Sequence, residues 1–193
     1  LLITGIGSLV VLYSIGYLSK SEQLGNFYCY LLLFMGAMLG VVLSDNFIIL
    51  YLFWELTSFS SFLLISFWRE KKASIYGAQK SLIITVLGGL SMLGGIILLS
   101  LATDTFSIQA MISKASDIQN SPFFILVMIL FMIGAFTKSA QVPFYIWLPD
   151  AMEAPTPVSA YLHSATMVKA GLYLIARITP IFAISEGWVW TIT

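Results

Sequence analysis

Six long apolar stretches dominate the sequence and restrict the chain to structures that cross a lipid bilayer. A membrane-spanning helix needs about 20 mostly apolar residues. The stretches that meet or approach this length are Leu1–Leu18, Phe27–Ser44, Phe47–Trp68, Ser81–Ala102, Phe123–Gln141 and Val158–Ile178. Because no water reaches the lipid core, backbone amides there must be hydrogen-bonded within the protein. The sequence therefore predicts an all-α polytopic membrane protein, with residues 1–193 forming a single transmembrane domain.

The composition excludes several other classes of protein and site. Only 9% of residues are charged, against roughly 25% in a soluble domain. The net charge is zero, so there is no basic surface of the kind that binds nucleic acid. One cysteine and one histidine exclude most metal sites built within this segment. No Gly-rich phosphate loop or nucleophile elbow occurs, and we expect no cofactor, no metal and no catalytic centre.

The basic residues predict how the spans are oriented. Connections after the first, third and fifth spans carry Lys20, Arg69, Lys71, Lys72 and Lys80, whereas the opposite side carries Lys114 and Arg177. Loops rich in lysine and arginine face the cytoplasm in most membrane proteins. We therefore expect the connections Arg69–Lys80 and Pro149–Pro157 to be cytoplasmic.

Glu55 is an ionisable residue near the middle of the third span. A charge at that depth is costly unless it faces a partner or water, so each such residue is a functional candidate. A carboxylate whose proton affinity a nearby lysine can change is suited to taking up and releasing a proton. The alternative is a structural carboxylate that is hydrogen-bonded to a neighbouring helix.

Lys138 precedes a proline near the end of the fifth span. Pro143 lacks a backbone N–H, and its ring clashes with the carbonyl of Ser139, so the helix should break around Ser139–Val142. Irregular backbone at membrane depth is tolerated where it lines protein or water. A lysine beside such a break is typical of the ion sites of secondary transporters. The alternative is that Lys138 extends along the helix toward the cytoplasmic surface.

His163 and Lys169 share the last span. Six residues apart, they point about 120° away from each other on an ideal helix. A local π-bulge or a bridging water would bring the two side chains nearer to one face. A lone histidine is often a satisfied core residue, but a buried lysine two turns further on favours a proton relay.

Several motifs of the sequence resemble one family. They are Phe53-Trp54-Glu55-Leu56, Ser61–Trp68, Lys138–Phe144, Trp147–Met152, Pro155–Ala160 and His163–Gly171. Their order and length are similar to those of the proton-translocating antiporter-like subunits. This family is shared by Mrp-type Na⁺/H⁺ antiporters and the membrane arm of respiratory NADH:quinone oxidoreductase. The resemblance spans at least Trp54–Arg177.

The resemblance implies a fold and an activity. Members of this family consist of inverted helical repeats, each with a discontinuous helix. This chain looks like most of the first repeat of a longer chain. It implies that Glu55 and Lys138 form a coupled acid–base pair, and that His163 links them to a central lysine-rich channel. It also implies a multi-pass protein of the bacterial cell membrane, assembled with other subunits of a hetero-oligomeric antiporter complex. Such a complex is a secondary active transporter, not an enzyme, and exchanges cytoplasmic Na⁺ for external H⁺.

Departures within the family favour the antiporter branch. The respiratory form is expected to carry threonine at the position of Lys169, and arginine and aspartate at the positions of Val86 and Gly89. The chain therefore resembles the large, A-type subunits of Mrp antiporters, with Lys169 as a further proton-exchange site. The alternative is an antiporter-like subunit of the redox-driven pump. A third interpretation is a membrane scaffold whose buried charges are inert.

Overall fold

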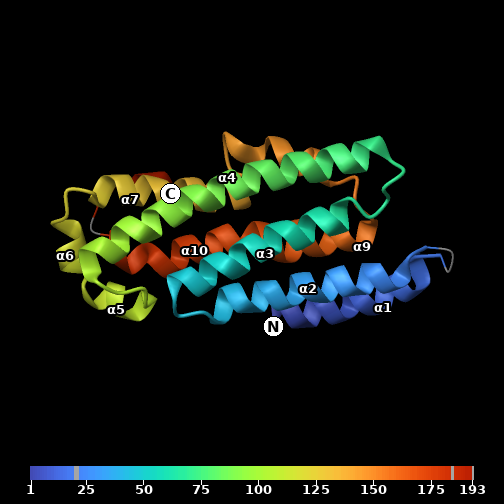
Figure 1. Ribbon diagram of the computed structural model, residues 1–193, viewed down its shortest axis with the longest axis horizontal. Coiled ribbons are helices and arrows are strands. Elements are labelled where there is room, and N and C mark those ends of the chain that lie inside the picture. Colours follow the sequence, from blue (N-terminus) through green and yellow to red (C-terminus); the bar gives the residue numbers. More distant parts are fainter. Residues whose placement is uncertain (20–21, 184, 193) are drawn as a thin grey trace.

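A computed structural model describes residues 1–19, 22–183 and 185–192, and in this part of the chain all regular secondary structure is helical. Figure 1 shows the long helices lying side by side in an elongated bundle. The main helices are α1 (Gly7–Tyr17), α2 (Leu24–Leu43), α3 (Phe47–Ile65), α4 (Lys72–Thr103), α7 (Phe124–Lys138) and α10 (Met167–Phe182). The shorter elements are η1 (Leu2–Ile6), α5 (Ile108–Ser113), α6 (Ala115–Gln119), η2 (Phe144–Trp147), α8 (Leu148–Ala151), α9 (Thr156–Ser159), η3 (Ala160–Thr166) and α11 (Glu186–Ile192).

Four helical segments are long and apolar enough to cross a membrane. They are α2, α3, α4 and the continuous segment Thr156–Phe182, which joins α9, η3 and α10. Two further apolar segments, Leu2–Tyr17 and Phe124–Lys138, are helical but shorter. Each predicted span therefore falls on a helix, and the prediction of an all-α membrane fold is confirmed.

The predicted connection Arg69–Lys80 was wrong. Helix α4 begins at Lys72, so the residues between α3 and α4 are only 66–71. The hydroxyl of Ser74 donates to the carbonyl of Ile65 over 2.5 Å and joins the start of α4 to the end of α3. Hydropathy identifies only the apolar part of a helix. Helix α4 begins before that part, in a stretch of more polar residues. The residues between the fourth and fifth predicted spans, 103–122, likewise contain two short helices, α5 and α6.

The long helices pack against one another in a chain of neighbours. Helix α2 packs on α3, α3 on α4, α4 on α7, and α7 on α10, which also contacts α2. Large side chains from distant parts of the sequence fill the centre, among them the fully buried Trp54, Phe131 and Trp147. The contact between α10 and α2, which are far apart in sequence, closes the bundle.

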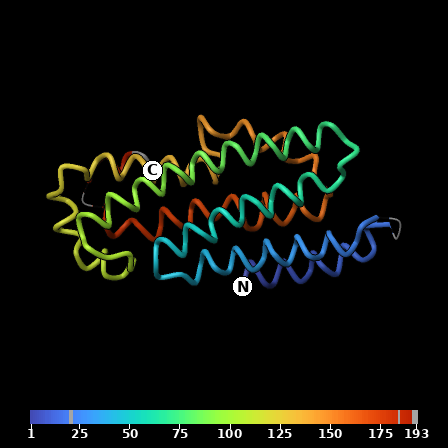
Figure 2. Tube along the Cα trace, viewed as in Figure 1, coloured from blue at the N-terminus to red at the C-terminus, as the bar shows by residue number. Residues whose placement is uncertain are grey.

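The discontinuous helix that the sequence predicted is present. Helix α7 ends at Lys138, and Ala140 adopts a left-handed backbone conformation with φ of 51°. The Val142–Pro143 peptide is cis, after which the chain resumes as η2 and α8. Because α4 contacts α7, η2 and α8, the segments before and after the break both follow α4 (Figures 1 and 2).

The last spanning segment contains a π-helical stretch. Residues Ala160–Thr166 form seven residues of π-helix between α9 and α10. The hydroxyl of Thr166 donates to the carbonyl of Tyr161, five residues earlier, over 2.7 Å. A π-helical stretch of the kind considered for His163 and Lys169 is therefore present; it includes His163 and ends at Thr166.

Candidate functional site

Lys138 lies at the end of α7 and points into the bundle. Its side chain is fully buried, and its Nζ donates to the carbonyl of Trp54 over 3.0 Å and to the hydroxyl of Ser58 over 2.6 Å. The ammonium also lies 5.2 Å from the centre of the Trp54 ring. Both acceptors belong to α3, so the break after Lys138 leaves its side chain anchored on the neighbouring helix. It does not extend to the surface.

Glu55 lies next to these acceptors on α3. It is partly buried, and its Oε1 is buried without a hydrogen-bond partner among the described residues. Glu55 and Lys138 are within electrostatic range of each other. The ion pairs within 4.0 Å in the described part of the chain are Lys80–Asp150 and Arg177–Asp45. The site thus holds a carboxylate and an ammonium as neighbours without direct contact.

Two glycines of α4 give this site its shape. A Cβ added at Gly89 would overlap Oε1 of Glu55, and a Cβ at Gly88 would overlap the hydroxyl of Thr137. Glycine allows neighbouring helices to approach closely in a membrane bundle. Gly88 and Gly89 therefore let α4 close over α3 and α7 where Glu55 and Lys138 lie.

His163 lies against the ring of Trp147. The histidine, in η3, is 6% exposed, and its ring centre is 5.9 Å from that of Trp147. The Ala151 backbone lies beside the ring, but neither ring nitrogen has a hydrogen-bond partner within the described residues. The Nε1 of Trp147 donates to the carbonyl of Thr137 over 2.9 Å. Trp147 therefore connects His163 to the residue that precedes Lys138.

Lys169 is the candidate residue that does not lie near Glu55, Lys138 and His163. It is exposed, and no hydrogen bond or ion pair of its side chain is found in the described part of the chain. It lines a groove of about 370 Å³ whose other walls are mainly apolar, including Leu2, Met38 and Val42. The π-helix of η3 is present, yet His163 faces the core while Lys169 faces outward.

The sequence alone did not predict the roles of Ser58 and Trp147. Ser58 was visible as a polar residue three positions after Glu55, but its contact with Lys138 joins residues 80 positions apart. In the sequence, Trp147 stood out only as the first residue of the motif Trp147–Met152. Its hydrogen bond to Thr137 depends on how the chain folds back after the break, which no local signal reveals.

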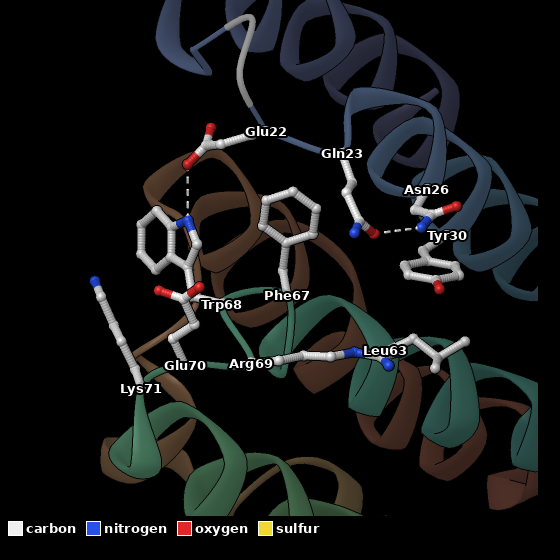
Figure 3. A pocket seen from close by; sticks show the side chains of 10 residues that line it. All are labelled: Glu22, Gln23, Asn26, Tyr30, Leu63, Phe67, Trp68, Arg69, Glu70 and Lys71. Atoms are coloured by element: carbon white, nitrogen blue, oxygen red, sulfur yellow. Dashed lines mark hydrogen bonds between the residues drawn. The ribbon is translucent and has the colours of Figure 1, made fainter.

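A pocket of about 380 Å³ opens at the surface where α3 ends and α2 begins (Figure 3). Trp68 donates from Nε1 to Glu22 over 2.9 Å, and the ammonium of Lys71 lies 3.8 Å from the centre of the Trp68 ring. Arg69 and Glu70 also line it. This pocket is separate from the buried site because none of Glu55, Lys138 and His163 lines it.

Among the described residues no group of three or more His, Cys, Asp or Glu side chains could hold a metal ion.

Comparison with protein families supplies the wider context for this buried site. A family model described as "NADH:quinone oxidoreductase/Mrp antiporter, TM" matches residues 44–193. A second, described as "NADH-Ubiquinone oxidoreductase (complex I), chain 5 N-terminus", matches residues 1–28. The chain belongs to the NADH:quinone oxidoreductase/Mrp antiporter family. The family resemblance inferred from the motifs is thereby confirmed.

Individual members of the family are also closely similar. Over all 193 residues the chain is 88% identical to proteins named Na(+)/H(+) antiporter subunit A1 from Staphylococcus aureus strains JH9 and Newman, and it spans 24% of their length. The resemblance to the A-type subunits of Mrp antiporters is therefore confirmed as well.

Solved structures agree with this assignment. The solved Mrp complex from Dietzia sp. DQ12-45-1b matches with a TM-score of 0.84 and 41% identity, over 90% of this chain and 19% of that chain. An archaeal membrane-bound sulfane sulfur reductase matches with a TM-score of 0.81 and 23% identity, over 98% of this chain and 38% of that chain. At that identity the second match shows a common fold only.

Proposed function

We propose that the chain is part of a proton-conducting subunit of a multisubunit Na⁺/H⁺ antiporter in the bacterial cell membrane, which exchanges cytoplasmic Na⁺ for external H⁺. The observation that carries the proposal is the fully buried Lys138, hydrogen-bonded to α3 beside the unpartnered carboxylate oxygen of Glu55. The name of the Staphylococcus aureus relatives supports the same activity. The protein is then a secondary active transporter subunit, not an enzyme, and it works in a complex with other subunits.

The chemistry of the site suits reversible proton transfer. An ionised carboxylate only accepts hydrogen bonds, whereas an ammonium only donates them. Because Lys138 and Glu55 are not in direct contact, a proton would pass between them through an intervening water: an N–H bond of Lys138 breaks, an O–H bond of Glu55 forms, and both groups become neutral. Each proton that moves changes the proton affinity of the neighbouring group, so Glu55 and Lys138 exchange protons as a coupled pair.

His163 and Lys169 extend this relay toward the rest of the protein. The unpartnered ring nitrogens of His163 can accept a proton from one side and release it on the other. Lys169 lies on the outer face of the same helical segment, where it serves as a further exchange site. Residues 1–193 then form one transmembrane domain, most of the first inverted repeat of a longer chain, with the connection between α3 and α4 on the cytoplasmic side.

Gly89 favours the antiporter over the redox-driven pump. The resemblance places an aspartate at this position in the respiratory form, but in this chain any Cβ there would overlap Oε1 of Glu55. The arrangement of Glu55 therefore depends on the glycine that the Mrp branch carries.

The proposal is tested with Glu55→Ala and Lys138→Ala in the full-length chain, assembled with its partner subunits in everted membrane vesicles. Both variants should abolish Na⁺-dependent proton flux while the complex still assembles, because each removes one member of the coupled pair. Lys71→Ala, at an exposed position, is the control and should transport normally. Normal flux in both buried variants would contradict the relay.

A further inference from the structure

The shortest hydrogen bond of Lys138 is the one to Ser58. The distance from Nζ to the serine Oγ is 2.6 Å, against 3.0 Å to the carbonyl of Trp54. Ser58 is 1% exposed, so water does not compete freely for this contact. The hydroxyl also lies 3.5 Å from the Trp54 carbonyl, to which it can donate. Ser58, and not Glu55, is therefore the side chain that binds the ammonium directly.

Ser58 differs in this respect from the other buried hydroxyls of α3. Thr57 donates to the carbonyl of Trp54, and Ser60 donates to the carbonyl of Leu56. Such bonds back to the same helix are the usual arrangement for hydroxyl residues in helices. Ser61 is fully buried, and its hydroxyl has no partner among the described residues. Within this group, only Ser58 binds the side chain of a residue from another helix.

We infer that Ser58 is a positioning residue, which keeps the Lys138 amine apart from Glu55 and supports it in both its charged and its neutral state. The inference rests on the proposed function. A carbonyl such as that of Trp54 can only accept a hydrogen bond, so it can bind an N–H group of either state but cannot bind the lone pair of the neutral amine. A hydroxyl can accept from the ammonium and, after rotation, donate to the lone pair of the neutral amine.

The consequence concerns the rate at which protons leave the lysine. With Ser58 present, Lys138 can pass a proton to Glu55 and remain hydrogen-bonded in the same place. Without Ser58, the one remaining hydrogen-bond partner of Nζ among the described residues is the carbonyl of Trp54, which can only accept. It holds an N–H group of the lysine and leaves the lone pair of the neutral amine without a donor in that position. Loss of Ser58 should therefore slow the transfer step and leave the binding of Na⁺ unchanged.

The test compares Ser58→Ala, Ser58→Cys and Ser61→Ala in the full-length chain within its assembled complex. Ser58→Cys leaves no cavity but offers only a weak donor and acceptor. Both Ser58 variants should lower the maximal Na⁺-dependent proton flux about tenfold, the order expected for losing a hydrogen bond to a charged group. The Na⁺ concentration at half-maximal flux should stay the same, and Ser61→Ala should transport like the wild type.

Three results would overturn the inference. They are wild-type flux in Ser58→Ala, full flux in Ser58→Cys, which would assign the loss to a cavity, and an equal loss in Ser61→Ala. The variants Glu55→Ala and Lys138→Ala are measured in the same vesicles. If they transport normally, the proposed function fails and the inference fails with it. If they are inactive while Ser58→Ala transports normally, only the role of Ser58 is refuted.

Discussion

Lys138 and Lys169 begin from similar sequence surroundings and reach opposite environments. Each lies within a predicted span, where charged residues are rare. Lys138 is fully buried and bound to two oxygens of α3, whereas Lys169 faces outward into a mainly apolar groove. Both hydrogen-bond acceptors of Lys138 belong to these residues. The surroundings of Lys169 depend on whatever lies against the outer face of α10.

The comparison teaches that burial is decided by the neighbouring helices. Around Lys138, two glycines of α4 bring three helices together, and the ammonium is hydrogen-bonded to two oxygens of α3. Around Lys169, the neighbouring segments leave an open groove on the side that the lysine faces. Replacing Lys138 by a side chain of another shape should therefore be destabilising, whereas Lys169 should tolerate such a replacement.

The largest difference in stability is expected between two single variants in which Lys138 or Lys169 is replaced by arginine. Lys138→Arg forces a larger, planar group into a filled space, and overpacking of a core typically costs about 1–3 kcal/mol. Lys169→Arg, in an open groove, should leave the thermal midpoint of the complex unchanged. Thermal unfolding of the two detergent-solubilised complexes measures the difference. Equal destabilisation would show that the face of Lys169 is as tightly covered as that of Lys138.

A smaller effect should separate two glycines of the same helix. Gly89→Ala places a methyl group against Oε1 of Glu55, whereas the nearest atom to a Cβ at Gly94 is Leu130 Cδ1 at 3.7 Å. We expect Gly89→Ala to lower Na⁺-dependent proton flux about tenfold, since overpacking displaces the carboxylate. Gly94→Ala is the control and should transport normally. A similar loss in both variants would mean that α4 responds to any added volume.

The smallest effect is expected at the ion pair between Lys80 and Asp150. These groups are 2.6 Å apart, with 27% and 38% of their side chains exposed, and they join α4 to α8 near the helix break. Ion pairs with this exposure contribute little to stability. Lys80→Ala should therefore keep both the flux and the thermal midpoint near wild type. A large loss of either would show that surface charges hold the discontinuous helix in place.

Much of the buried site could be predicted from the sequence. Glu55 and Lys138 stand out because an ionisable residue in an apolar span is rare and costly. Pro143 predicts the break because the reason for it is local: a missing N–H and a steric clash. The bounds of α4 were less accessible, because hydropathy indicates where lipid begins and not where the helical hydrogen bonds stop.

The parts that could not be predicted are contacts between distant segments. Ser58 and Lys138 are far apart in the chain, and so are Gly89 and Glu55. Whether Lys169 faces the core depends on which side of α10 is covered, and an apolar helix carries little information about that. The residue types of the site could therefore be identified from the sequence, whereas its geometry required the packed bundle.

The π-helical stretch Ala160–Thr166 has a consequence for the phase of the helix that contains it. A π-turn holds about one residue more than an α-turn, and one residue corresponds to about 100° of rotation around the axis. Residues before and after η3 are therefore out of register with a single α-helix. On an ideal α-helix His163 and Lys169 already point about 120° apart, and the π-helical stretch changes this angle without bringing the two side chains onto one face. The continuous segment therefore presents a buried histidine and an exposed lysine.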